Sequence, residues 1–133
     1  MSPTKEVAIS FESFAVTNIN YSVAQNANAS DNNLEISIIN KSRNFEENHF
    51  DVIIELVIKN ADESLLLNLT TRSRFKTKDA ITEDFKTSKF MDVNVPAIVF
   101  PYIRAFVTTL TSNSDISAII LPTFNFTSLR QDN

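Results

Sequence analysis

The sequence of 133 residues contains no glycine, no cysteine and no tryptophan, and it has a single histidine. The absence of cysteine excludes a disulfide framework and a thiolate metal site. The absence of glycine argues against loops that cradle phosphate groups by close approach of the backbone. Asparagine is the expected substitute where the backbone needs a positive φ angle. Five asparagines lie where turns are predicted, namely Asn26, Asn28, Asn32, Asn33 and Asn113.

Positive charge is also scarce, because the 12 lysines and arginines are outnumbered by 16 acids. No basic stripe is available to neutralise phosphates, so a nucleic-acid partner is not expected. The N-terminal residues lack the pattern of a signal peptide. No apolar run reaches the roughly 18 residues of a membrane span. We therefore expect a cytoplasmic protein without a membrane partner.

Residues for catalysis or metal binding are sparse. His49 stands at the start of a predicted strand, and no serine or aspartate motif frames it as a general base. One histidine with scattered acids is a poor metal site. Asp79, Glu83 and Asp84 are interpreted as the ordinary acidic start of a helix. The sequence predicts no enzyme, no metal and no cofactor.

Alternating apolar and polar residues predict four β-strands within residues 7–76. The first runs from Ile9 to Val23, and its apolar residues change parity at Thr17–Asn18, which predicts a bulge or a break. The others begin at Leu34, at Phe50 and at Leu65. Short connections between consecutive strands favour an antiparallel meander.

The second half of the chain changes from strand to helical patterns. A link with a short helix is expected over residues 77–95, the main helix over 96–113, and an apolar crossover with a C-terminal stub over 114–133. Residues 1–133 are therefore predicted to form one α+β domain, with one long helix packed on one face of the sheet.

Prolines and asparagines set the expected limits of the main helix. Asn94 is predicted to cap it, and Pro96 suits its first turn. Pro101 removes a hydrogen bond, so the helix either begins near Val99 or bends. Asn113 is predicted to end it in a left-handed conformation.

The main helix is too apolar to be covered on one side only. Spacings of three and four place five apolar residues on one face, with Phe100 and Tyr102 widening it. Such a helix needs cover on more than one side, from a partner subunit or a ligand. The predicted oligomer interface consists of Val99, Ile103, Phe106, Val107 and Leu110.

One stretch of the sequence resembles the C-terminal half of the SecB family of protein-export chaperones. The matching positions are Asn94, Pro96, Val99, Phe100, Pro101, Tyr102, Arg104, Leu121, Pro122, Asn125 and Phe126. In that family, four-stranded antiparallel sheets pair into dimers, and long helices pack between dimers to make a tetramer. The resemblance implies a homo-oligomer, either dimer or tetramer.

The resemblance also implies an ATP-independent holdase for non-native polypeptides, either preproteins or an aggregation-prone antitoxin. A holdase needs exposed apolar grooves with little shape selectivity. Six phenylalanines lie around irregular segments and element ends and are predicted to contact clients. They are Phe75, Phe85, Phe90, Phe100, Phe124 and Phe126.

The match to export chaperones is incomplete where those proteins dock on the SecA motor. The family uses an acidic patch on the sheet and a zinc-binding C-terminal tail. Here Glu12 is the candidate motor-binding residue, whereas the family's sheet glutamate falls near the neutral Asn68. Since cysteine is absent, we expect a member without the zinc-binding tail, for which an antitoxin client fits at least as well as SecA delivery.

Two other functions remain open at this point. A small-ligand carrier would hold an apolar molecule between helix and sheet. A structural subunit would use the apolar helix for oligomerisation alone and would bind no client.

Overall fold

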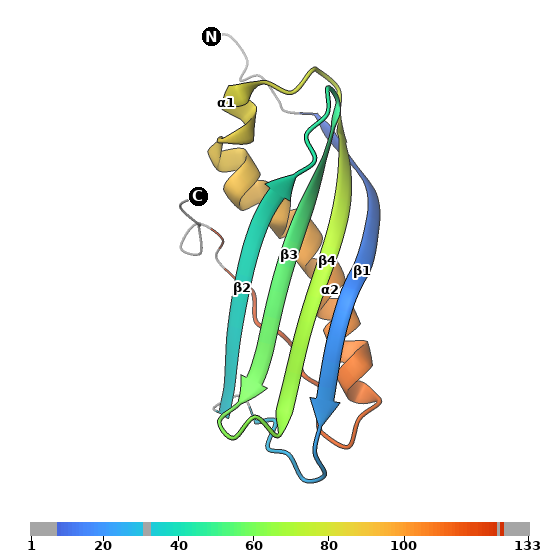
Figure 1. The fold of residues 1–133 in the computed structure, drawn as a ribbon, viewed down its shortest axis with the longest axis vertical. Coiled ribbons are helices and arrows are strands. Elements are labelled where there is room, and N and C mark those ends of the chain that lie inside the picture. Colours follow the sequence, from blue (N-terminus) through green and yellow to red (C-terminus); the bar gives the residue numbers. More distant parts are fainter. Residues whose placement is uncertain (1–7, 31–32, 125, 127–133) are drawn as a thin grey trace.

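The computed structural model describes residues 8–30, 33–124 and 126 of the chain. It contains four strands, a short helix, a π-helical turn and one long helix (Figure 1). In chain order these elements are β1 (Ile9–Val23), β2 (Leu34–Arg43), β3 (His49–Asn60), β4 (Leu65–Thr77), α1 (Glu83–Lys86), η2 (Phe90–Asn94) and α2 (Val95–Ser112).

The strands form one antiparallel sheet, and α2 crosses one of its faces (Figure 1). The predicted α+β architecture of four antiparallel strands and one long helix is therefore confirmed. The predicted meander is wrong for β1, because the order is β1-β4-β3-β2. The connection after β1 carries the chain to the opposite edge of the sheet, which gives a Greek-key order. Both β1 and β2 are edge strands.

The pairing of β1 with β4 is interrupted twice. One register shift lies between Val16 and Asn18, where the sequence predicted a bulge or a break, and a second lies between Phe11 and Ser13. Each shift inserts an extra residue and increases the local twist. The 15-residue edge strand is therefore bent along its length.

The core lies between the sheet and α2. Alternate side chains of β3 and β4 point to this side and are fully covered, which is the two-residue period expected of strands. On these strands the buried apolar residues are Phe50, Val52, Ile54, Leu56, Ile58, Leu65, Leu67, Leu69 and Phe75. Burial of each such side chain stabilises the fold by about 1.5–3 kcal/mol.

Neither end of the main helix has the predicted cap conformation. Asn94 has helical angles and makes no side-chain capping bond, because η2 continues directly into α2. Val95 N–H donates to the Phe90 carbonyl across the wider π turn. The turn directly precedes Pro96, whose ring would clash with a carbonyl in a regular helix. At the other end, Asn113 has φ −97° and is not left-handed.

Positive φ angles occur at three described residues, Asn26, Asn44 and Glu63. Only Asn26 belongs to the asparagines expected at turns, and Asn32 lies outside the described residues. The side chain of Asn44 donates a hydrogen bond of 2.7 Å to Asp51 Oδ2, which stabilises this connection.

The helical segment Phe90–Ser112 spans 23 residues and its most apolar window has a mean hydropathy of 1.4. By length and composition it could cross a membrane, contrary to the expectation from the sequence. The core helix of a soluble protein meets the same criterion, and one face of α2 is buried against the sheet.

Candidate polypeptide-binding surface

The segment after α2, residues 116–124, returns along the same side of the sheet (Figure 1). Three α2 side chains fix its backbone. Ile119 N–H donates to Thr111 Oγ1 at 2.8 Å, and Thr108 Oγ1 donates to the Ile119 carbonyl at 2.9 Å. Arg104 Nε donates to the Leu121 carbonyl at 3.0 Å. We call residues 116–124 the crossover.

The anchored backbone makes side chains of the crossover alternate between core and solvent. Ile119 and Leu121 are buried, whereas Ile120 between them is 68% exposed. An apolar side chain this exposed gains nothing from the folded subunit itself. It marks a surface that other molecules can contact.

An apolar groove lies between the crossover and β2. Its volume is about 190 Å³, and its lining residues are Leu34, Ile36, Ile119, Ile120 and Pro122. Among the described strands, β2 pairs only with β3, so its other edge keeps unpaired backbone groups. Apolar side chains and hydrogen-bonding backbone are therefore available side by side.

Aromatic rings fill the end of the sheet near α1. Phe11, Phe75, Phe50 and Phe45 stack in succession, with ring centroids 5.1, 5.2 and 6.0 Å apart. Phe85 meets Phe50 edge-on at 5.8 Å. The inner rings are buried, whereas Phe45 and Phe85 are half-buried at the margin of the stack.

The six phenylalanines predicted to contact clients divide into two groups. Phe75, Phe100 and Phe126 are buried within the subunit, so their surface is already occupied by core contacts. Phe85, Phe90 and Phe124 are half-buried. The structure brings Phe85 within 6.1 Å of Phe90, and places Phe124 against Phe100 at 5.0 Å.

Sequence reasoning expected client contacts near the crossover but did not name the groove residues there or on β2. The alternation around Leu34 and Ile36 predicted a strand but not its place at the edge of the sheet, where both residues are only partly covered. The signal that could have found the site is the run Ile119-Ile120-Leu121 before Pro122. An extended run of three apolar residues cannot bury all of them on one side.

The predicted oligomer interface also divides. Val99, Ile103 and Val107 are fully buried against the sheet within one subunit, whereas Phe106 and Leu110 are half-buried. Two other apolar residues of α2 are more exposed, Ile98 at 38% and Tyr102 at 50%, and Tyr102 lies beside Phe11 and Phe14 of β1.

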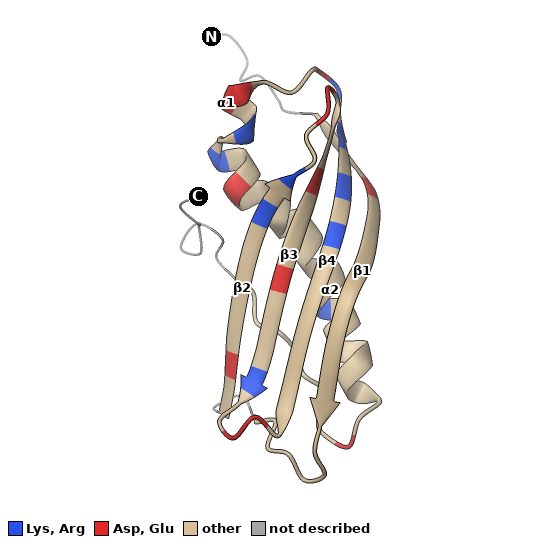
Figure 2. Ribbon diagram, in the orientation of Figure 1, with Lys and Arg blue, Asp and Glu red and all other residues tan. Residues whose placement is uncertain are grey.

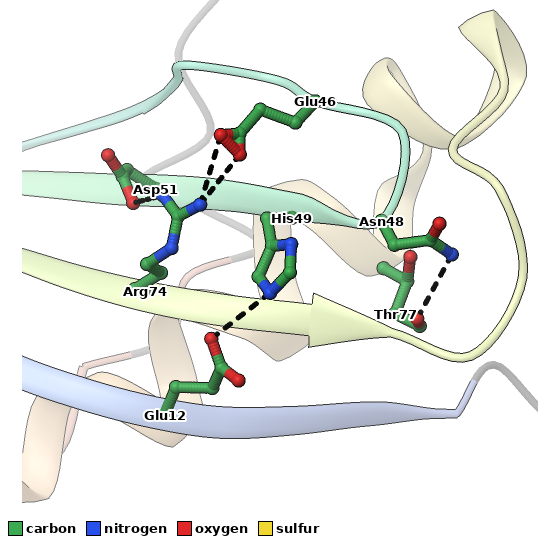
Figure 3. A network of polar contacts seen from close by, with 7 residues as sticks. All are labelled: Glu12, Glu46, Asn48, His49, Asp51, Arg74 and Thr77. Atoms are coloured by element: carbon green, nitrogen blue, oxygen red, sulfur yellow. Dashed lines mark hydrogen bonds and ion pairs between the residues drawn. The ribbon is translucent and has the colours of Figure 1, made fainter.

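Polar contacts connect the strands on the face of the sheet away from α2, which we call the outer face (Figure 3). Arg74 bonds Glu46 at 2.7 Å and Asp51 at 3.2 Å. The hydrogen bonds that Arg74 donates to the Glu46 carboxylate raise the pKa of Arg74 above its ordinary value. Glu12, the predicted motor-binding residue, lies 3.3 Å from His49 Nε2.

The described residues contain no group of three His, Asp or Glu side chains placed to hold a metal ion. The contact between His49 and Glu12 joins β3 to β1 across β4, so a role in holding the strands together accounts for it.

Solved structures with a similar fold include a SecB-like chaperone of Mycobacterium tuberculosis, Rv1957, in complex with a ChAD peptide from the HigA1 antitoxin Rv1956. It is 15% identical, with a TM-score of 0.69 over 87% of this chain and 89% of that one. A Streptococcus agalactiae protein of unknown function is 11% identical, with a TM-score of 0.55 over 90% of this chain and all of that one.

Among curated proteins, the uncharacterised protein MJ0357 of Methanocaldococcus jannaschii is 45% identical over 40 residues, or 30% of this chain. That match spans about a quarter of MJ0357, 26% of its length. The model of the family described as preprotein translocase subunit SecB matches residues 6–133. This match covers nearly the whole chain, and the protein therefore belongs to the SecB family.

Proposed function

We propose that the protein is an ATP-independent holdase chaperone that binds non-native polypeptides along the edge of β2. The observation that carries the proposal is the exposed Ile120 in an apolar groove beside an unpaired strand edge. Membership in the SecB family supports a chaperone role.

The groove suits an extended polypeptide better than a compact ligand. An unfolded segment can add to the free edge of β2 through backbone hydrogen bonds, which require no particular sequence. Alternate side chains of that segment would then point toward Ile36 and Ile120. The half-buried Phe85, Phe90 and Phe124 add further apolar contacts.

Release needs no nucleotide in this mechanism. Each client side chain buried in the groove contributes about 1.5–3 kcal/mol, and much of this gain is offset by ordering of the client. Binding is therefore weak at each site and exchanges rapidly. The absence of glycine, which phosphate-cradling loops need, supports independence from ATP.

Two client classes fit this surface, preproteins and aggregation-prone antitoxins. We favour the antitoxin class, since a chaperone of similar fold has been solved with a peptide from an antitoxin. Docking on SecA through Glu12 would have to compete with the contact between Glu12 and His49.

We further propose that the protein acts in the cytoplasm as a homo-oligomer assembled through the exposed side of α2. Ile98 and Tyr102 supply apolar surface there, and the half-buried Phe106 and Leu110 extend it. Several grooves on one oligomer would raise avidity for a long client without new contacts.

A small-ligand carrier is less well supported. Ligand pockets usually enclose about 300–1,000 Å³. The groove offers about 190 Å³, and its exposed Ile120 would leave a bound small molecule partly in water.

The test is suppression of aggregation, followed by light scattering when a chemically denatured protein is diluted into the chaperone without ATP. The wild type should suppress aggregation, and Ile120→Asp should weaken client affinity about tenfold or more, because an apolar contact is replaced by a charge. Ile39→Asp is the matched control, since Ile39 is 37% exposed on the outer face of β2, away from the groove.

Failure of the wild type to protect any of several unfolded proteins, while it remains folded, would overturn the holdase function. Equal weakening by Ile120→Asp and Ile39→Asp would instead show that the groove is not the binding site.

A further inference from the structure

The outer face of the sheet is basic although the protein as a whole is acidic. Figure 2 shows lysines and arginines along β4 and at the end of β2, with acids on β1, β2 and β3, and the strand register places these cations on the outer face. The acids of the described chain lie mostly in turns and in the link before α2. The acids on the strands, Glu12, Glu35, Asp51 and Glu55, also lie on this face, so its positive excess is small and comes from the end where β2 and β4 carry several cations.

Strand register gathers four cations at one end of this face. Lys41, Ile53 and Arg72 occupy one row across β2, β3 and β4. The next row contains Arg43, and Lys76 lies two residues beyond Arg74 on β4. We call Lys41, Arg43, Arg72 and Lys76 the basic patch.

Most acids around the basic patch are already engaged, whereas Glu55, two residues from Ile53 on β3, forms no ion pair among the described residues. Asp51 is only 7% exposed and bonds Arg74 and Asn44. Glu46 bonds Arg74, and Glu12 contacts His49. Within the described chain, none of the four patch cations forms an ion pair.

Unpaired cations on one rigid face repel each other, and a carboxylate-rich partner would relieve this repulsion. Three of the four side chains are exposed and Lys41 is partly exposed, so a partner can reach them. Apolar atoms lie among the charges, since Ile53 separates Lys41 from Arg72 and Ile39 is exposed at the border.

We propose that the basic patch docks an acidic polypeptide segment, in which aspartates and glutamates alternate with apolar residues. The carboxylates would pair with Lys41, Arg43, Arg72 and Lys76, while apolar side chains rest on Ile53 and Ile39. This surface lies on the opposite face of the sheet from the groove, so its partner and a client can bind together.

The experiment measures the fluorescence anisotropy of a labelled peptide in which Asp and Glu are interspersed with Leu. A second peptide carries Asn and Gln in place of every acid. The wild type should bind only the acidic peptide, and raising the salt from about 0.05 to 0.3 M should weaken the binding because exposed charges are screened.

The double variant Lys41→Glu/Arg72→Glu should bind the acidic peptide about tenfold more weakly, or weaker still. The matched control is Lys59→Glu/Lys89→Glu, which changes the net charge by the same amount at positions outside the patch. Its affinity for the acidic peptide should stay within about threefold of the wild type. The patch variant should still suppress client aggregation, which separates this surface from the proposed groove.

Three results would overturn the proposal. The first is that both double variants weaken binding of the acidic peptide equally. The second is that the wild type binds the uncharged peptide as tightly as the acidic one. The third is that the wild type binds a DNA duplex through the patch more tightly than it binds the acidic peptide.

Discussion

A single hydroxyl group on α2 secures the crossover. Thr111 is fully buried, and its Oγ1 donates to the Val107 carbonyl while accepting from Ile119 N–H, both at 2.8 Å. The threonine thereby satisfies a buried backbone donor that no strand pairs. Its position sets which crossover side chains face the core and which face the groove.

Thr111→Val keeps the shape of the side chain but leaves Ile119 N–H buried without a partner. We expect the free energy of unfolding to fall by about 1–3 kcal/mol, measured by denaturant unfolding followed by circular dichroism. Thr109→Val, at an exposed position on the same helix, should change it by less than about 0.5 kcal/mol. Indistinguishable unfolding of the two variants would rule out this role for Thr111.

At the scale of elements, α2 keeps a proline in its interior. Pro101 lies in the seventh position of the helix, is exposed, and removes one backbone hydrogen bond. The helix tolerates this cost because its other face is fully packed on the sheet.

Pro101→Ala should therefore stabilise the protein. Restoring the helical hydrogen bond outweighs the extra freedom of the unfolded chain, for a net gain of about 1–2 kcal/mol in the free energy of unfolding. Pro122→Ala in the crossover has no helical bond to restore and should lower it by about 0.4–1 kcal/mol. Thermal unfolding of both variants tests the opposite signs, and a shared sign would refute the explanation.

Local sequence patterns predicted the limits of the strands well, but they did not predict which strands pair with each other. The strand limits and the irregularity at Thr17–Asn18 follow from side-chain alternation, which is a local property. The place of β1 beside β4 depends on contacts across the whole chain, and turn residues do not encode it. Asn94 was predicted as a cap because asparagine favours that position and Pro96 suits a first turn, whereas the π turn before Pro96 has no local pattern that marks it.

The candidate site was harder to predict than the fold. Of the six phenylalanines, sequence position could not separate buried Phe75 from half-buried Phe85. Both lie near the end of a predicted element, and the sequence does not show which of them another element covers. Exposure depends on which element covers each ring. The same reason explains why Val99 was predicted at a subunit interface but is covered by the sheet of its own subunit.

At the scale of the molecule, two apolar surfaces lie at different places on the subunit. The groove follows the edge of β2, whereas Tyr102 packs on Phe11 and Phe14 of β1 with centroids 4.8 and 5.6 Å apart. The groove and the exposed part of α2 are therefore separate surfaces, as the proposed client and subunit contacts require.

Ile98→Asp/Tyr102→Glu should dissociate the oligomer, because two charges would be buried in an apolar interface. Multi-angle light scattering should show a shift from a multiple of the subunit mass toward a single subunit at micromolar concentration. Ile39→Asp adds a charge on the outer face and should leave the mass unchanged. A wild-type protein that is already monomeric would remove the basis of this proposal.

Because the protein has few ultraviolet fluorophores, its own emission interferes little with fluorescence measurements on a bound polypeptide. With no tryptophan and two tyrosines, its emission comes from Tyr21 and Tyr102. Tyr21 bonds Ser114 at 2.6 Å, where α2 turns into the crossover, and Tyr102 lies on the exposed side of α2. Tyrosine emission should therefore report changes both where α2 turns into the crossover and on the exposed part of α2. A tryptophan in a bound polypeptide can be excited selectively, because the protein has none.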